Sequence, residues 1–162
     1  MFKLSTRHRV KGQKAETAFR AWLNWSAVAY MYVEQSPFTV PAALKGRIKR
    51  PDYLVGLPHV GLLAFDVKAK SVYDGMLIFE RDEVEKLALF ARMFHVTLYF
   101  VCVGIEDTAH IWIALADLQA RPLERRGRRQ VLTFPVEAGF QVQLEQPFLD
   151  ALFTMAAAAS QG

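Results

Sequence analysis

Cysteine is nearly absent from this chain, and long apolar runs are missing. The one cysteine among 162 residues, Cys102, excludes an internal disulfide framework. The longest apolar stretches, residues 96–105 and 151–159, are far shorter than the roughly twenty residues of a membrane helix. No apolar segment of a signal peptide follows the basic N-terminus. We therefore expect a protein of the reducing cytoplasm with no membrane contact.

Two kinds of binding motif are also lacking. The four histidines lie far apart and have no His-x-x-x-His spacing, which argues against a zinc site. The glycines form neither a phosphate-binding loop nor a dinucleotide-binding pattern, so ATP-driven chemistry is not indicated.

The composition is that of a globular protein, with 52% hydrophobic and 22% charged residues. No internal repeat occurs, and no linker is long enough to divide domains. We expect a single domain over residues 1–162, with a core over about 9–115 and a C-terminal extension over 116–162.

Basic residues exceed acidic ones only mildly, with a formal net charge of +4, but they are clustered. One cluster lies near the N-terminus, a second over residues 45–50 and a third over 121–129. Such clusters suit a phosphate backbone, although basic runs are also common as solvated loops. The residues that we expect to contact DNA are Arg7, Arg9, Lys11, Lys14, Lys49, Arg50 and Lys70.

Apolar periodicity predicts the order of the elements. After a basic arm (1–12), we expect a helix (13–28), a strand (29–33), a loop (36–50), a hairpin (53–57 and 60–70), a strand (76–79), a helix from Asp82 with Glu85 placed as in a capping box, strands (96–103 and 111–114), a basic loop (118–130), an edge strand (131–136) and a terminal helix (147–158). The order α-β-β-β-α-β implies an α/β fold with a central mixed sheet flanked by helices.

The most informative residues are Asp66 and Lys68, at the end of the apolar run 62–68. Side chains alternate faces along a strand, so this acid and this lysine point the same way. Two charges at the end of an apolar strand are costly unless they have partners or a function. A second acid, Asp52, follows a proline and begins the neighbouring strand.

These residue types suit a divalent metal beside a phosphate. Mg²⁺ prefers carboxylate and carbonyl oxygens, which Asp52, Asp66 and the carbonyl of Val67 can supply. Glu16 is a further carboxylate, expected in the first turn of the first helix, and it reaches the metal directly or through water. Lys68 can orient or deprotonate a water, or neutralise charge in the transition state. The alternative is that neither motif has a functional role: Asp-x-Lys at a strand end can be an exposed ion pair, and Pro-Asp is a common pair in turns.

Pro51-Asp52, thirteen intervening residues and Asp66-Val67-Lys68 resemble the motif of the PD-(D/E)xK nuclease superfamily. The opening helix, with Glu16, and the segment 80–91 are similar to those of archaeal-type Holliday-junction resolvases. The resemblance covers roughly residues 9–103 and leaves the arginine-rich segment 121–129 unmatched.

The resemblance implies a restriction-endonuclease-like αβββαβ core, Mg²⁺-dependent DNA cleavage with Mn²⁺ as a substitute, and frequently a homodimer. It assigns Asp52, Asp66 and Glu16 to the metal and Lys68 to catalysis. The chain departs from the resolvases in carrying Asp66 where they usually have glutamate, and in its long, proline-containing segment 34–51.

Two functions follow from these observations. The first is a Mg²⁺-dependent DNA endonuclease, with branched DNA as one candidate substrate; repair, recombination, phage defence and mobile-element processing all stay open as its pathway. The second is a nucleic-acid-binding subunit on the same scaffold, either catalytically silent or dependent on a partner protein for targeting.

Overall fold

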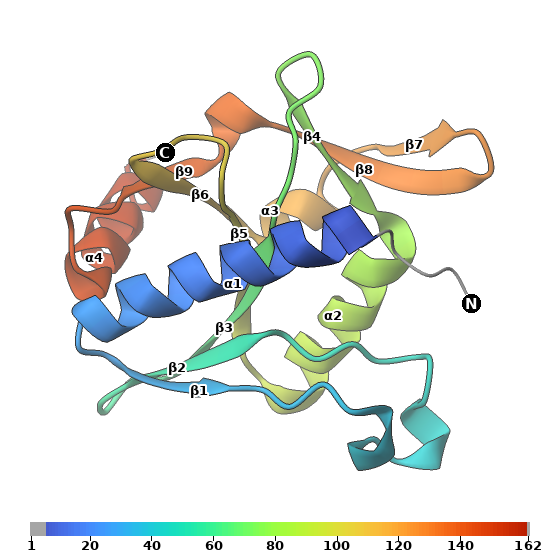
Figure 1. The fold of residues 1–162 in the computed structure, drawn as a ribbon, viewed down its shortest axis with the longest axis horizontal. Helices are drawn as coiled ribbons and strands as arrows, with labels where there is room; N and C mark the ends of the chain where they lie inside the picture. The colour runs from blue at the N-terminus through green and yellow to red at the C-terminus, as the bar shows by residue number, and fades with distance from the viewer. Residues whose placement is uncertain (1–5, 162) are drawn as a thin grey trace.

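In the computed structural model, which describes residues 6–161, the chain begins with the 20-residue helix α1 (Thr6–Trp25) (Figure 1). Its buried residues Ala15, Phe19, Trp22 and Leu23 recur at helical spacing and face the sheet. The expected basic arm is wrong from residue 6 onward, because residues 6–12 are already helical; residues 1–5 lie outside the described part. Glu16 consequently lies in the middle of α1, not in its first turn.

A six-stranded mixed sheet forms the centre of the molecule. Its strands, in spatial order, are β1 (Ala29–Tyr32), β2 (Tyr53–Leu57), β3 (Gly61–Lys68), β5 (Thr97–Cys102), β6 (Ala109–Ala114) and β9 (Phe140–Gln143). All neighbours are antiparallel except β3 and β5, which are parallel. The parallel pair requires a crossover, and the intervening chain provides it with a strand and a helix. The predicted hairpin of β2 and β3 is confirmed.

A second sheet has three strands, in the order β4 (Met76–Glu80), β8 (Arg129–Pro135) and β7 (Leu123–Arg126). The expected basic loop over 118–130 is wrong, since it contains the end of α3 (Leu115–Gln119), the strand β7 and the start of β8. The expected edge strand is also wrong: β8 lies between β4 and β7, and β7 is the edge. Exposed charges on β7 are typical of such an edge strand.

Helices cover both faces of the central sheet (Figure 1). On one face, α1 and α4 (Phe148–Ala159) enclose an aromatic cluster that includes Phe19, Phe65 and Trp112. On the other face, α2 (Arg81–Phe94) and the second sheet enclose a cluster that includes Leu87 and Phe100. Residues beyond 116 contribute to both clusters, so the C-terminal part packs against the same sheet.

Helix α2 begins without the predicted capping box. Glu80 occupies the N-cap position and makes no side-chain cap hydrogen bond, and Glu85 pairs with Arg81 at 2.5 Å. Three short 3-10 helices lie at Pro37–Thr39, Ala42–Leu44 and Val136–Ala138. Within residues 6–161, no helix is both long and apolar enough to cross a membrane.

Candidate functional site

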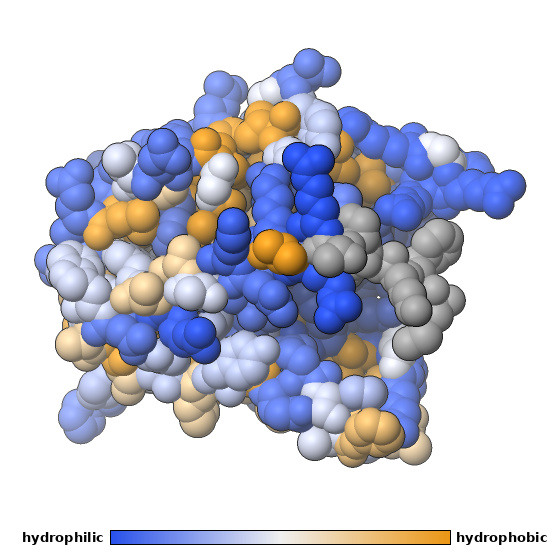
Figure 2. All heavy atoms as spheres, in the orientation of Figure 1, coloured by the Kyte–Doolittle hydropathy of each residue, from blue (hydrophilic) through white to orange (hydrophobic). Residues whose placement is uncertain are grey.

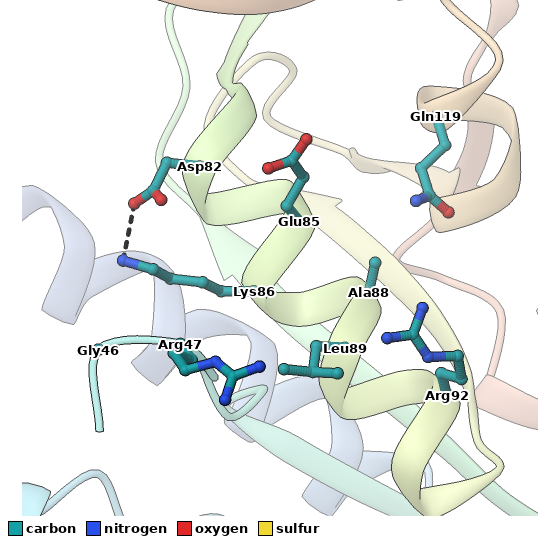
Figure 3. Close-up of a pocket in the computed structure, with 9 residues that line it drawn as sticks. All are labelled: Gly46, Arg47, Asp82, Glu85, Lys86, Ala88, Leu89, Arg92 and Gln119. Atoms are coloured by element: carbon teal, nitrogen blue, oxygen red, sulfur yellow. Dashed lines mark ion pairs between the residues drawn. The ribbon is translucent and has the colours of Figure 1, made fainter. Parts of the chain in front are cut away.

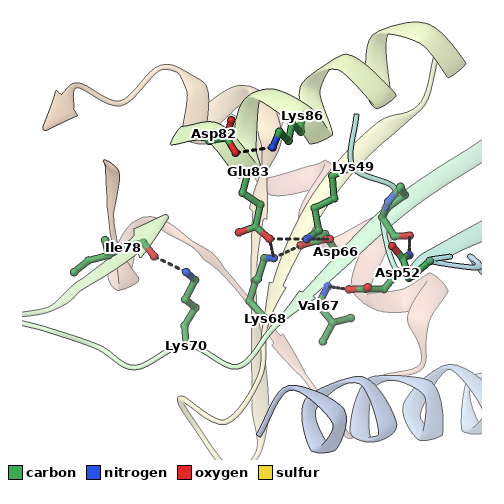
Figure 4. Close-up of polar contacts among 12 residues, drawn as sticks. Lys49, Asp52, Asp66, Val67, Lys68, Lys70, Ile78, Asp82, Glu83 and Lys86 are labelled. Carbon is green, nitrogen blue, oxygen red and sulfur yellow. Dashed lines mark hydrogen bonds and ion pairs between the residues drawn. The ribbon is translucent and has the colours of Figure 1, made fainter. Parts of the chain in front are cut away.

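The strand ends of β2 and β3 bring the two predicted aspartates together. Asp52 immediately precedes β2, and its backbone N–H donates to the carbonyl of Phe65 (2.9 Å). Its carboxylate Oδ2 accepts from the backbone N–H of Val67 (2.7 Å). Asp52, before the start of β2, and Asp66, near the end of β3, therefore lie side by side on neighbouring strands, as the motif predicts (Figure 4).

Two lysines and a second acid complete a charged cluster around Asp66, which is fully buried. The Asp66 carboxylate lies 2.9 Å from Lys49 Nζ and 2.6 Å from Lys68 Nζ. Both ammonium groups also donate to Glu83 Oε1, at 2.6 and 2.5 Å. Two positive and two negative groups thus alternate around the end of β3 (Figure 4). We refer to Glu16, Lys49, Asp52, Asp66, Lys68 and Glu83 as the acid–lysine cluster.

Charge within this cluster sets the protonation of Lys68 and Glu83. Burial alone would lower the pKa of Lys68, but Asp66 and Glu83 raise it well above its ordinary value. Burial alone would raise the pKa of Glu83, but Lys68 and Lys49 lower it to about 2. Lys68 is therefore a protonated donor in this arrangement, suited to neutralising or orienting an anion.

Two carboxyl groups have pKa values shifted in the opposite direction. Burial, followed by the charge of Asp66, raises the pKa of Asp52 to about 7. The same two causes raise the pKa of Glu16, which lies half-buried on α1 and within electrostatic range of Asp66, Lys49 and Lys68. The backbone carbonyl of Glu16 accepts from the hydroxyl of Tyr53 (3.3 Å), which ties this part of α1 to β2.

The donor set fits a hard divalent cation. Asp66 Oδ2 is buried, and the partner described for it is the ammonium group of Lys68, at 2.6 Å. This oxygen can accept a cation, and Asp52, Glu16 and the Val67 carbonyl supply oxygens of the kind that Mg²⁺ prefers. Over residues 6–161, however, no three Asp, Glu, His or Cys side chains are already grouped as a metal site. A cation at Asp66 must therefore compete with the two lysines.

The predicted DNA contacts divide into two groups. Arg7, Arg9, Lys11 and Lys14 are exposed along the first turns of α1, and Lys11 Nζ donates to Ser71 Oγ (3.3 Å). The other three make internal contacts. Lys49 belongs to the cluster, Arg50 donates to Ser36 O and Thr39 Oγ1 (both 2.6 Å), and Lys70 donates to Ile78 O (2.5 Å) above the Phe79 ring.

Glu83 is the site residue that the sequence did not reveal, and Lys49 was expected only as a DNA contact. The one signal for Glu83 is its place in the first turn of a helix that follows a strand, beside the buried Val84. A separate pocket lies on the outer side of α2, between that helix and the loop at Gly46 and Arg47 (Figure 3). None of the cluster residues lines it.

Comparison with known proteins supports the fold. No protein-family model and no curated protein matches the chain. Among solved structures, the Holliday junction resolvase Hjc of the archaeon Archaeoglobus fulgidus matches with a TM-score of 0.56 and 22% identity, over 81% of this chain and 91% of that one. D212, a nuclease from a fusselovirus, matches with a TM-score of 0.46 and 10% identity, over 90% of each chain. The chain therefore has the fold of the Hjc resolvase, a central mixed sheet flanked by helices, consistent with its resemblance to the PD-(D/E)xK nuclease superfamily.

Proposed function

We propose that this protein is a metal-dependent DNA endonuclease that acts on branched DNA. The observation that carries the proposal is the acid–lysine cluster at the ends of β2 and β3, in a fold shared with a Holliday junction resolvase. Mg²⁺, or Mn²⁺ in its place, is the proposed cofactor. Asp52, Asp66, Glu16 and the Val67 carbonyl are its proposed ligands.

Each proposed role follows from the surroundings of the residue. A bound cation would supply the charge that activates water and stabilises the phosphorane-like transition state. Lys68, kept protonated by Asp66 and Glu83, neutralises a non-bridging phosphate oxygen or orients the attacking water. Lys49 and Glu83 position Lys68 and Asp66 through the ion pairs described above.

The exposed basic residues Arg7, Arg9, Lys11 and Lys14 supply phosphate contacts beside the site. A homodimer would suit a two-fold branched substrate, because it places two sites for paired incisions. Light scattering coupled to size-exclusion chromatography tests that part: a single species near 37 kDa, twice the chain mass of 18.4 kDa, is expected, and a monomer would contradict it.

A cleavage assay tests the proposal. A labelled four-way junction, the corresponding linear duplex and a single strand are incubated with Mg²⁺, with Mn²⁺ or with EDTA. Metal-dependent cleavage of the junction alone is the expected result. Equal cleavage of all three would retain the nuclease and remove the junction preference. Binding without cleavage under any metal would instead support the silent or partner-dependent subunit.

A further inference from the structure

An arginine-rich hairpin projects from the body of the molecule, formed by β7 and the first part of β8 (Figure 1). Arg126 pairs with Arg129 across a two-residue loop of Gly127 and Arg128. Gly127 has a φ of 63°, which fits the first loop position of a type II′ turn, where glycine is favoured. The turn is therefore built to hold four arginines at the end of a narrow two-stranded ribbon.

This hairpin carries most of the charge excess of the chain. Residues 123–130 contain four arginines and one glutamate, a net charge of +3, against a formal net charge of +4 for the whole protein. The four arginines nearest the turn, Arg125, Arg126, Arg128 and Arg129, are all exposed. The end of the ribbon is correspondingly hydrophilic (Figure 2, upper right).

Internal contacts neutralise only half of these arginines. Arg129 pairs with Glu80 (2.6 Å) and Arg126 with Glu124 (3.6 Å). Arg125 donates to the backbone carbonyl of Gly127 (3.2 Å), which leaves its charge uncompensated. Within the described part of the chain, neither Arg125 nor Arg128 has an acidic partner. Both are thus available for an external anion.

The ribbon is fastened to the segment that also carries part of the acid–lysine cluster. Glu80 pairs with Arg129, and Arg81 donates to the side chain of Gln130 (2.5 Å). Glu83, in the first turn of the same helix, bonds to Lys49 and Lys68. A ligand held by the ribbon is consequently held at a fixed position relative to the cluster.

We propose that this hairpin inserts into a groove of duplex DNA and holds the arm that flanks the cleaved strand. The major groove admits a two-stranded ribbon, and arginines at its tip reach phosphates and base edges. The choice of DNA as ligand rests on the proposed function. The placement of the contact rests on the hairpin itself, and its test measures binding separately from cleavage.

The experiment compares two double variants of the full chain in EDTA, so that binding is measured without cleavage. Arg125→Gln/Arg128→Gln removes two unpaired arginines from the ribbon. Arg47→Gln/Arg92→Gln is the matched control, because it removes two exposed arginines that face each other between α2 and the loop at Gly46 and that have no ion pair within residues 6–161 (Figure 3). Fluorescence anisotropy gives the Kd for a labelled duplex and for a single strand from 50 to 300 mM salt.

The ribbon variant is expected to bind the duplex about tenfold more weakly and to reduce the slope of log K against log salt by about 2. The control is expected to bind as the unmodified protein does. Equal losses in both variants, or equal losses for duplex and single strand, would overturn insertion into a groove, as would unchanged binding. If the ribbon variant keeps its duplex affinity while the unmodified protein shows metal-dependent cleavage, the proposed hairpin contact is rejected and the nuclease function is retained. If the ribbon variant binds more weakly but the unmodified protein cleaves no substrate, the nuclease function is rejected and the hairpin contact is retained.

Discussion

The two aspartates of the cluster lie side by side but have different partners. Asp66 is held between two ammonium groups, whereas the Asp52 carboxylate accepts from the backbone N–H of Val67. Burial raises the pKa of Asp52 to about 7, so this group changes charge near neutral pH. Because a cation binds the ionised carboxylate, a proton would compete at Asp52 with the proposed metal.

We therefore expect the affinity for Mg²⁺ to rise with pH up to about 7 and then to level off. Below that value the protonated fraction of Asp52 grows, and affinity should fall by about tenfold per pH unit. Calorimetric titration from pH 5.5 to 8.5 measures this dependence. In Asp52→Asn the affinity should be weaker and its pH dependence much flatter. A pH-independent affinity in the unmodified protein would contradict the assignment of Asp52 to the metal.

Glu83 tests whether the ion pairs position Lys68. In Glu83→Gln, Lys68 loses one of two acidic neighbours, so its pKa should fall. In a plot of cleavage rate against pH, the alkaline limb, where Lys68 loses its proton, should therefore move to lower pH. We expect cleavage to slow by about tenfold and Mg²⁺ to bind more weakly, because both lysines then pair with Asp66 alone and compete more strongly with the cation. Glu85→Gln, an exposed acid in the same helix, is the control and should leave the profile unmoved. An unmoved alkaline limb in Glu83→Gln would assign Glu83 a structural role only.

The sequence could predict part of this cluster and not the rest. Alternation along one strand is enough to place Asp66 and Lys68 on the same face. The sequence does not single out Glu83, because residues 80–85 contain four acids and their order alone does not show which one faces the site. The apolar stripe of α2 identifies its buried face, but it does not say which border of that face meets β3.

At the scale of elements, helix α1 carries Glu16 and covers the strands that carry the aspartates. Phe19, one turn further along, is fully buried and contacts the rings of Trp22, Tyr53, Phe65 and His110. The attachment of α1 to the sheet thus depends largely on one aromatic cluster.

Phe19→Ala is expected to lower the free energy of unfolding by about 3–5 kcal/mol, because it removes a buried ring and leaves a cavity. Trp25→Ala, at an exposed position of the same helix, should cost less than about 1 kcal/mol. Urea denaturation of the two variants measures both values. Similar losses in both would show that the helix is stabilised by its own propensity and not by the cluster.

The predicted elements were correct where apolar periodicity is strong and wrong where charge dominates. The hairpin of β2 and β3 and the strand β5 have apolar runs with turn residues between them. Helix α1 extends seven residues beyond the expected start, since its basic first turns show no apolar stripe but are rich in lysine and arginine, which are good helix formers. The sequence predicts a loop at β7, because the pairing with β8, and not the sequence of β7 itself, makes this segment a strand.

At the scale of the whole molecule, a buried histidine links stability to pH. His110 is 2% exposed on β6, with its ring against Phe19 and Trp22, and burial lowers its pKa to about 4. Because this pKa lies below the ordinary value of 6.5, the unfolded chain takes up the proton first. The contribution of His110 is complete above pH 6.5 and is lost as the pH falls through 4.

We expect this residue to remove up to about 3 kcal/mol of stability between pH 7 and pH 4. Asp52 acts in the opposite direction over the whole of this range, because its pKa is raised from 3.8 to about 7 and the folded state therefore binds the proton more tightly. Denaturant unfolding of the unmodified protein and of His110→Gln across this range separates the two. The variant should lose less stability on acidification. Parallel curves of unfolding free energy against pH for the two proteins would exclude His110 as the source of the loss.

Cleavage by Asp66→Asn tests the central claim most directly. Asp66 is buried at the centre of the acid–lysine cluster, whereas Asp82→Asn, an exposed acid paired with Lys86, is the matched control. With Mg²⁺ and a labelled four-way junction, we expect Asp66→Asn to lower the rate by at least about a hundredfold while the control cuts normally. Circular dichroism checks that both variants are folded. A folded Asp66→Asn protein that retains the full rate would show that this cluster is not the site of cleavage.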